Sequence, residues 1–160
     1  MCAEGAKFRV SMTHARRIPI RNYMTEARAF ASPSESVLDA YRRMIEHDIR
    51  HLPVLQGEHL VGVLFKSDLK LIESLDSAAV KPIDVKAMMV TEYYTVPPDE
   101  ALDVAAREMS KRKYGSALVV DRGRVIGVFT TTDALRALSD ALTDDLPESM
   151  RFSVTPAAGL

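Results

Sequence analysis

Apolar residues recur along the chain at two different spacings, and the alternation of these spacings predicts a mixed α/β (α+β) fold. The first helical segment is expected to begin at Pro33 and Ser34, with Ser34 as its N-cap. Apolar residues then follow three or four positions apart, as on one face of a helix: Val37, Tyr41, Met44 and Ile45. A second segment repeats this layout, with Asp99 as the expected cap and a matching apolar stripe: Leu102, Ala105, Ala106 and Met109.

Each predicted helix is followed by two apolar runs that flank a polar turn, a pattern typical of a β-hairpin. In the first hairpin "HLPVL" and "LVGVLF" surround "QGEH", and in the second "SALVV" and "VIGVFT" surround "DRGR". A second amphipathic segment follows each hairpin, and a short strand-like stretch precedes each first helix, in residues 28–32 and 93–97. The predicted unit is therefore β-α-β-β-α, and it occurs twice.

The two units are copies of one another at a constant offset of 65 residues. Residues 18–72 fall on residues 83–137 without a gap, and eleven of these 55 positions are identical, among them Gly62 with Gly127 and Asp68 with Asp133. A long period that occurs only twice argues against a solenoid, which needs three or more stacked units. Two copies predict a pair of repeats packed with pseudo-twofold symmetry.

The duplication divides the chain into five parts. We expect an N-terminal arm in residues 1–17, a first repeat in 18–75, a linker in 76–82, a second repeat in 83–142 and a C-terminal tail in 143–160. Pro82 would stop a helix from running through the linker. The tail has no clear hydrophobic period, so we expect it to be partly disordered.

Composition limits the classes of function. The formal net charge of −1 gives no global attraction to nucleic acid or to an anionic membrane. No apolar run approaches the ~20 residues that span a bilayer. The one cysteine, Cys2, cannot form an internal disulfide, and the four histidines do not have metal-ligand spacing. We therefore expect a cytoplasmic protein with neither a membrane segment nor a metal site.

The segment "GVFTTTD" (residues 127–133) runs from a predicted strand into a predicted helix. Unpaired backbone N–H groups and the helix dipole favour phosphate at such a helix N-terminus. Thr130 and Thr132 add hydroxyl donors, and an ionised Asp133 accepts hydrogen bonds, which suits ribose hydroxyls. Helix capping, worth about 1 kcal/mol, explains the same residues without a ligand. Taken alone, the motif favours capping over ligand binding.

The order of these pieces in both copies resembles a tandem pair of cystathionine β-synthase (CBS) domains, a Bateman module. The resemblance spans roughly residues 18–142 and is carried by "NYMTEA" and "KAMMVTE", "ASPSESVLDAYRRM" and "VPPDEALDVAAREM", "IRHLPVL" and "YGSALVVD", and "GVLFKSD" and "GVFTTTD". It implies two α/β repeats whose sheets pack together and leave two symmetry-related clefts. In the family such clefts bind AMP, ADP, ATP or S-adenosylmethionine, and the module biases a partner and often pairs with a second module.

Family roles carried over to this chain give a first candidate site, closed by the second motif. Its expected residues are Ser32, Val37, Ile49, Arg50, Val128, Thr130, Thr132 and Asp133. Asp133 would hold the ribose, Thr130 and Thr132 would lie near the phosphates, and Val128 would pack on the base. Gly115 and Ser116 stand where the family often has basic phosphate contacts, which departs from its pattern.

The second candidate site reverses that pattern. Its expected residues are Arg50, His51, Val63, Ser67, Asp68, Pro97, Leu102 and Tyr114. Asp68 would hold the ribose, and Arg50 and His51 fall on the basic, phosphate-facing positions. Arg50 fits an ordinary surface residue equally well. Phe65 stands where the motif has Ser or Thr, so a hydroxyl is lost and bulk is added, and we expect the two sites to be unequal.

The motifs favour a regulatory module that is not an enzyme, because no nucleophile elbow, P-loop or pair of catalytic carboxylates accompanies them. Its ligand would be an adenine nucleotide or S-adenosylmethionine, no cofactor is required, and its partners would be a second copy of the chain and an unidentified regulated protein. One alternative is a structural, dimerisation or protein-interaction module with vestigial clefts. Another is nucleic-acid binding through "HARRIPIR" (residues 14–21), although such a basic run is more often a solvated face.

Overall fold

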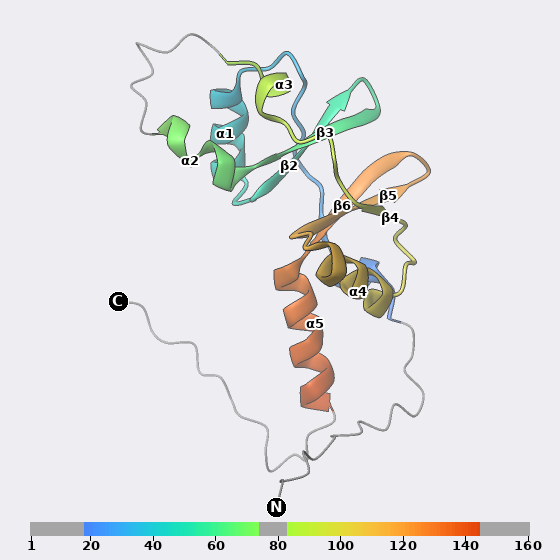
Figure 1. The fold of residues 1–160 in the computed structure, drawn as a ribbon. Helices are drawn as coiled ribbons and strands as arrows, with labels where there is room; N and C mark the ends of the chain where they lie inside the picture. The colour runs from blue at the N-terminus through green and yellow to red at the C-terminus, as the bar shows by residue number, and fades with distance from the viewer. Residues whose placement is uncertain (1–17, 74–82, 145–160) are drawn as a thin grey trace, which may run out of the picture.

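The computed structural model describes residues 18–73 and 83–144, and it has two α/β halves, one above the other in Figure 1. The predicted arm (1–17) and linker (76–82), and all but the first two residues of the predicted tail, lie outside the described residues. The first repeat contains η1 (Ile20–Asn22), β1 (Thr25–Glu26), α1 (Val37–Glu46), β2 (His51–Gln56), β3 (His59–Phe65) and α2 (Lys66–Glu73). The second contains α3 (Val85–Met88), β4 (Thr95–Val96), α4 (Leu102–Arg112), β5 (Ser116–Asp121), β6 (Arg124–Thr130) and α5 (Thr131–Asp144). The expected α/β (α+β) class is confirmed, and each repeat has the predicted helix, hairpin and second helix. Strand β4 lies within the predicted residues 93–97, whereas the strand predicted in residues 28–32 is reduced to an isolated bridge at Ala31, and β1 lies earlier in the chain.

The residues that begin each repeat pack against the other repeat. Strand β1 pairs antiparallel with β6, with Thr25 opposite Val128, in a four-stranded sheet of order β1-β6-β5-β4. In the other half, Val90 forms an antiparallel bridge with Val63 of the β2-β3 hairpin. Thr25 and Val90 are equivalent positions of the two repeats, as are Val63 and Val128. Each half is therefore completed by a short extended segment from the other copy, which keeps the two halves together.

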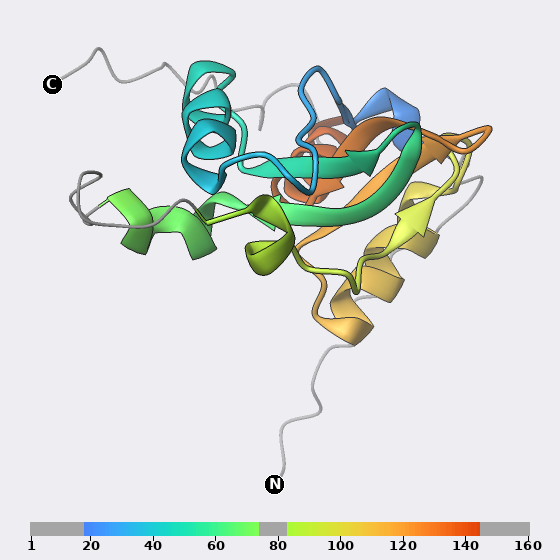
Figure 2. The same ribbon diagram turned by 90° about the horizontal axis from the view of Figure 1, so that it is seen from above.

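Each half also has its own buried core, because the apolar stripe of its first helix packs on its hairpin. The first core contains Val37, Ala40, Met44, Leu52, Val54, Leu64 and Leu69, and the second contains Ile20, Val96, Ala105, Met109, Val119 and Phe129. A smaller cluster joins Val63, Leu118 and Val128 of three different strands. Figure 2 shows the strands of both halves meeting in the middle, with α1 and α2 at one end and α4 at the other.

The predicted helix caps are wrong by two residues in both repeats. Ser36 rather than Ser34 caps α1, and its hydroxyl accepts the backbone N–H of Leu38 at 3.2 Å. Ala101 rather than Asp99 occupies the N-cap position of α4, without a side-chain cap bond. The helices begin two residues later than predicted because Ser36 and Ala101 each form a backbone bridge to the segment that begins the other repeat. The chain must therefore stay extended at these two positions before the helix can begin.

Candidate functional site

A cleft of about 450 Å³ lies between the first repeat and the start of α5. This volume is within the range of small-molecule sites, roughly 300–1,000 Å³. The stretch after the start of β1 contributes residues 25–29, and the turn between α1 and β2 contributes residues 48–51. The junction of β6 and α5 contributes Val128, Thr130, Thr131, Thr132, Asp133 and Arg136. The cleft therefore combines residues that are far apart in the sequence.

Asp133 is the one charged residue that is buried among those described, with 5% of its surface exposed. Its Oδ2 accepts hydrogen bonds from the backbone N–H of Thr130 at 2.9 Å and from the Thr130 hydroxyl at 2.7 Å. The backbone N–H of Asp133 donates to Thr130 Oγ1 at 3.3 Å. These reciprocal bonds form a capping box around the first turn of α5. The capping interpretation of the motif is therefore realised, and it uses one of the two carboxylate oxygens.

The other oxygen, Asp133 Oδ1, accepts a hydrogen bond from Arg136 Nη2 at 3.1 Å. The same nitrogen donates to the backbone carbonyl of Tyr23 at 2.6 Å, and the guanidinium lies 5.7 Å from the centre of the Tyr23 ring, within cation–π range. Sequence reasoning missed Arg136. The signal that could have found it is its spacing, because residues three apart share one helix face. Arg136 links the buried carboxylate to the residues just before β1.

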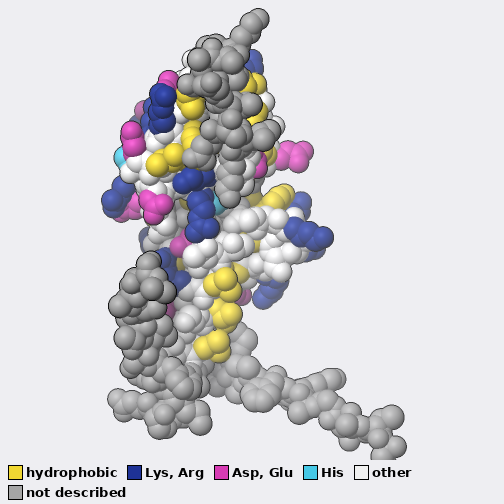
Figure 3. Space-filling model, turned by 90° about the vertical axis from the view of Figure 1, so that its left-hand side faces the viewer, with side chains coloured by type: hydrophobic (Ala, Val, Ile, Leu, Met, Phe, Trp, Pro, Cys, Tyr) yellow, Lys and Arg dark blue, Asp and Glu magenta, His cyan; other side chains and the backbone are white. Residues whose placement is uncertain are grey.

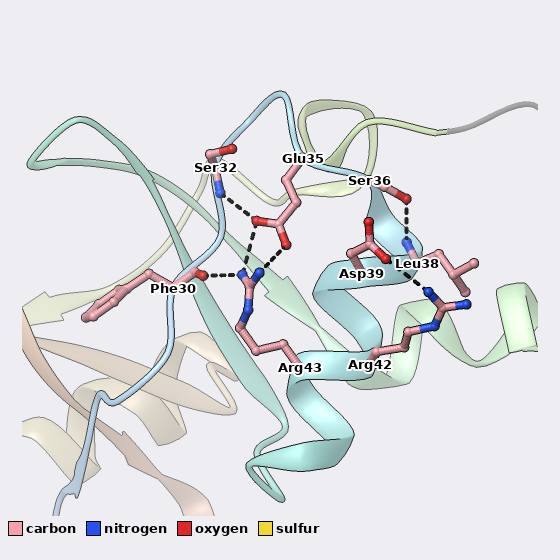
Figure 4. Close-up of polar contacts among 8 residues, drawn as sticks. All are labelled: Phe30, Ser32, Glu35, Ser36, Leu38, Asp39, Arg42 and Arg43. Atoms are coloured by element: carbon pink, nitrogen blue, oxygen red, sulfur yellow. Dashed lines mark hydrogen bonds and ion pairs between the residues drawn. The ribbon is translucent and has the colours of Figure 1, made fainter.

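The structure places most of the residues predicted for the first site in this cleft. Those that line it are Ile49, Arg50, Val128, Thr130, Thr132 and Asp133, whereas Ser32 and Val37 lie elsewhere. Val37 is 1% exposed in the core of the first half. The backbone N–H of Ser32 donates to Glu35 Oε2 at 3.2 Å, in a polar network that Glu35 shares with Arg43 of α1 (Figure 4).

The residues predicted for the second site lie in several places. Arg50 and His51 line the cleft already described, whereas Leu102 and Tyr114 line an apolar groove beside α4 and α5. Val63 is buried, Pro97 is exposed next to β4, and the exposed Ser67 donates its hydroxyl to Asp68 Oδ1 at 3.0 Å. The eight side chains predicted for the second site do not line one common cleft, in contrast to most of those predicted for the first site.

Phe65 changes the junction of β3 and α2 in the first repeat, where it occupies the position equivalent to Thr130. Its ring packs against the cluster of Val63, Leu118 and Val128, and meets the His51 ring edge to face at a centroid distance of 5.3 Å. It has no hydroxyl to bond Asp68. The residue equivalent to Arg136 is Leu71. Of the two junctions, only that at α5 has both the capping box and an arginine on the carboxylate.

The cleft has a basic edge next to its acidic groups. Arg28 forms an exposed ion pair with Glu26 at 3.1 Å, and Arg50 is exposed in the turn before β2. Burial and the nearby Arg50 guanidinium lower the pKa of His51 below its ordinary value, and Asp133 offsets part of this shift. His51 is therefore neutral at pH 7. Figure 3 shows Lys and Arg side chains at mid-height on one face, at the level where the two halves meet.

The described part of the chain meets the requirements of neither a metal-ion site nor a membrane-spanning helix. Within residues 18–73 and 83–144, no three His, Cys, Asp or Glu side chains form a group that could hold a metal ion. The helices of the same residues are too short or too polar to cross a bilayer.

Both halves of the chain match one protein family and several solved structures. The CBS domain family matches residues 20–72 and 85–140. The crystal structure of the CBS domain pair of protein MJ0100 in complex with 5′-methylthioadenosine and S-adenosyl-L-methionine is similar at a TM-score of 0.66 and 26% identity, covering 78% of this chain and 98% of that one. The crystal structure of CBSX2 in complex with AMP is similar at a TM-score of 0.62 and 28% identity, with coverage of 78% and 98%.

Among curated proteins, the similar sequences include larger enzymes. The chain is 29% identical to a homoserine O-acetyltransferase of Methanohalobium evestigatum over 123 residues, which are 76% of this chain and 24% of that protein. It is 34% identical to an inosine-5′-monophosphate dehydrogenase of Korarchaeum cryptofilum over 103 residues, 64% of this chain and 20% of that protein. The chain thus spans about a quarter or less of the length of these two relatives.

Proposed function

The chain belongs to the CBS domain family and carries two CBS domains in tandem, and from this premise we propose that it is a regulatory module that binds an adenine nucleotide in the cleft at Asp133. The solved CBS proteins with AMP, and with 5′-methylthioadenosine and S-adenosylmethionine, support an adenosine-containing ligand. The proposal assigns the cleft a binding role and no catalytic step. Its output is a change in the affinity of this chain for an unidentified protein partner.

The proposal depends mainly on Asp133, a buried carboxylate in the first turn of α5 that lines a cleft of the size of a small-molecule site. In the proposed complex Asp133 Oδ1 accepts from the ribose hydroxyls, since Oδ2 is held by Thr130. The phosphate lies at the first turn of α5, where backbone N–H groups and the helix dipole favour an anion. The base packs against the apolar side chains of Ile49 and Val128, which both line the cleft.

The arginines of the cleft favour a nucleotide over S-adenosylmethionine. Arg28 and Arg50 line the cleft, and the exposed Arg50 offers a guanidinium to a ligand phosphate. An arginine can bind a phosphate with two parallel hydrogen bonds. A sulfonium group cannot accept hydrogen bonds from these arginines. We therefore place AMP, ADP or ATP ahead of S-adenosylmethionine as the ligand.

Thermal unfolding and calorimetry with AMP, ATP, S-adenosylmethionine and GMP test this proposal. Linkage predicts stabilisation of about 2.7 kcal/mol when a ligand is at a hundredfold excess over its Kd. Asp133→Asn should remove the response to AMP, whereas Asp68→Asn, which changes the exposed equivalent carboxylate, should retain it. Arg50→Gln provides a second variant and should weaken AMP more than adenosine. Lack of any response in the wild-type protein at millimolar ligand, or unchanged AMP binding by Asp133→Asn, would refute the proposal.

The second repeat also supports a homodimer, because its two long helices leave an apolar groove of about 1100 Å³ unpaired. Exposed apolar side chains on these helices are Val104, Leu135, Leu138 and Leu142, and Figure 3 shows a column of hydrophobic side chains at the height of α5. The positions 65 residues earlier in the sequence are polar: Asp39, Lys70, Glu73 and Ser77. Large exposed apolar patches are rare on monomers and mark interaction surfaces.

A second copy of the chain fits this groove by charge as well. Asp103 in the first turn of α4 and Lys113 at its C-cap both line the groove, so a twofold axis across the helix would bring Asp103 of one copy to Lys113 of the other. Leu138→Lys should convert the dimer to a monomer in light scattering. Ile45→Lys, an exposed apolar residue on α1 of the first repeat, should not. A wild-type protein that is monomeric throughout the micromolar range would contradict the pairing.

A protein-interaction module with vestigial clefts is the second candidate function. One observation favours it, namely that both oxygens of Asp133 already have partners within the chain. On this view Asp133→Asn lowers stability but changes neither ligand response nor partner binding. Nucleic-acid binding through residues 14–21 has no comparable support, because residues 14–17 of that run lie outside the described residues.

A further inference from the structure

The carboxylate of Asp133 has too few open acceptor positions for a whole ribose. An ionised carboxylate offers about four lone-pair sites, two on each oxygen. On Oδ2 both are used by the N–H and the hydroxyl of Thr130. On Oδ1 one is used by Arg136 Nη2, which leaves one. The two hydroxyls of a ribose need two positions, so full binding requires Arg136 to give up its bond.

Arg136 is the partner that is able to move. Its side chain is 56% exposed, whereas that of Asp133 is 7% exposed and held by the capping box. An arginine keeps its charge under all ordinary conditions, so it leaves one anion most easily for another. Arg136 lines the same cleft as the first turn of α5, where the proposed phosphate would lie. A ligand phosphate can therefore replace the charge that Asp133 supplies.

The contacts of Arg136 extend beyond the cleft. Its Nη2 donates to the backbone carbonyl of Tyr23 at 2.6 Å, and the Tyr23 hydroxyl donates to Asp140 Oδ2 at 3.1 Å, so both groups tie the chain before β1 to α5. Strand β1 is only two residues long and lies at the edge of its sheet. The bonds of Arg136 and Asp140 to Tyr23 therefore add to the pairing of β1 with β6 in holding this edge. By contrast, Ile20 is fully buried and anchors the segment further upstream.

We propose that Arg136 is an exchangeable counterion that makes the cleft prefer phosphorylated adenosine and couples its occupancy to the edge strand β1. In the ligand-free protein Arg136 neutralises Asp133 and holds the Tyr23 carbonyl. When a nucleotide binds, its ribose hydroxyls take Oδ1, its phosphate takes the guanidinium, and the carbonyl of Tyr23 loses its side-chain donor. This inference rests on the proposed function, and it adds a specificity-determining residue and a route by which binding reaches β1.

The chain itself suggests the decisive variant, because the equivalent residue of the first repeat is Leu71. Calorimetry should compare AMP and adenosine in the wild-type protein, in Arg136→Leu and in Arg136→Lys. In Arg136→Leu, adenosine should bind several-fold tighter because Oδ1 is vacated, while the preference for AMP over adenosine should fall about tenfold, roughly 1.4 kcal/mol. Arg136→Lys should keep part of that preference. Arg107→Leu removes an exposed arginine of α4 and should change neither affinity.

If Arg136 is an exchangeable counterion, Arg136→Leu should change the affinities for adenosine and for AMP in opposite directions. A merely structural role would change both affinities in the same direction. If Arg136→Leu weakens adenosine and AMP equally, or changes neither, the proposal is wrong. If the wild-type protein binds neither ligand, the proposed function fails, and this inference fails with it. If AMP and adenosine bind the wild-type protein equally, adenosine-ligand binding at the cleft stands, but the proposed counterion role of Arg136 is wrong.

Hydrogen exchange gives an independent readout of the coupling. The amide of Met24 donates to Ile20 and that of Ala27 donates to Ile126, so both report on the segment that Tyr23 belongs to. AMP should raise the exchange rates of amides 24–27 in the wild-type protein, and Arg136→Leu should raise them without ligand. Slower exchange on AMP binding, or unchanged exchange in the ligand-free variant, would overturn the route to β1.

Discussion

The side chain of Met24 lies directly against Gly127, so that a Cβ at position 127 would stand 2.6 Å from the Met24 sulfur. The same Cβ would be 2.9 Å from the backbone carbonyl oxygen of Thr25. The equivalent pair in the other half is Met89 with Gly62. Both contacts occur where the segment that leads one repeat crosses a central strand of the other. Glycine permits this close approach of two chain segments.

Gly127→Ala should therefore destabilise the fold by about 1–3 kcal/mol, the usual cost of overpacking. A methionine side chain can turn aside, but the carbonyl of Thr25 belongs to the β1 backbone and cannot. Gly62→Ala should cost less, because its nearest backbone atom would be 3.1 Å away. Urea unfolding measures both, with Gly115→Ala as control, since no atom lies within 4 Å there. Equal midpoints for Gly127→Ala and Gly115→Ala would contradict this prediction.

Thr130→Val should remove the hydroxyl half of the capping box and cost about 1 kcal/mol of stability. The variant keeps the shape of the side chain and the backbone N–H that donates to Asp133 Oδ2, so the loss is confined to the hydroxyl bonds. Thermal unfolding provides the measurement. Thr132→Val changes an exposed threonine two residues along and should leave Tm nearly unchanged. A loss of the same size in both variants would mean that the cap contributes nothing specific.

The two ion pairs made by Glu35 and Glu58 should differ in their contribution to stability. The side chain of Glu35 is 17% exposed and contacts Arg43 through both carboxylate oxygens. Oε2 accepts a hydrogen bond from Arg43 at 3.1 Å. Oε1 lies 2.7 Å from the guanidinium as an ion pair, but its geometry does not make a hydrogen bond. Glu58 pairs with Arg124 at 2.9 Å, but both side chains are more than 70% exposed.

Glu35→Gln should therefore cost about 1.5–3 kcal/mol, since hydrogen bonds to charged groups contribute that much. Glu58→Gln should cost less than about 0.5 kcal/mol, as exposed pairs usually do. Chemical unfolding of the two variants compares them directly, with identical chemistry at each site. The interpretation of the network in Figure 4 would be wrong if Glu58→Gln proved the more destabilising change.

The neutral state of His51 should make the protein less stable in mild acid. Burial and Arg50 lower the pKa of His51 in the folded protein, so the unfolded chain binds its proton first as the pH falls. Stability rises with pH wherever the unfolded state binds more protons. The contribution of neutral His51 to the free energy of unfolding is therefore fully present above the pKa that His51 has in the unfolded chain, and it is lost as the pH falls below that value. Tm measured from pH 7.5 to 5 should drop less in His51→Asn than in the wild-type protein, whereas His59→Asn, which changes an exposed histidine, should follow the wild-type curve.

Local pattern was sufficient to predict both hairpins, both long helices and their duplication. A β-hairpin is formed by residues close together in the sequence, so apolar runs around a polar turn such as "DRGR" are enough to predict it. Strands β5 and β6 lie where that pattern predicts them. The capping box of Thr130 and Asp133 is equally local, because its two residues are three positions apart. The helix starts at Ser36 and Ala101 were predicted wrongly, since backbone bridges from distant segments decide them.

The candidate site could be predicted only in part for the same reason. Periodicity and the repeat offset point to Thr130, Thr132 and Asp133, which sit on one short stretch of chain. They could not indicate that Val37 is packed inside the core or that Arg136 reaches the carbonyl of Tyr23, 113 residues away in the sequence. These contacts depend on how the two halves dock.

The sequence by itself therefore determined that this protein has two equivalent α/β units and where each would place its carboxylate, because short-range spacing governs helices, hairpins and caps. Only the tertiary structure decided that each unit is completed by the leading segment of the other, and that Arg136 joins Asp133 to the carbonyl of Tyr23 beside the cleft. The physical reason is that a hydrophobic pattern states which face of an element is buried, but not which distant segment buries it.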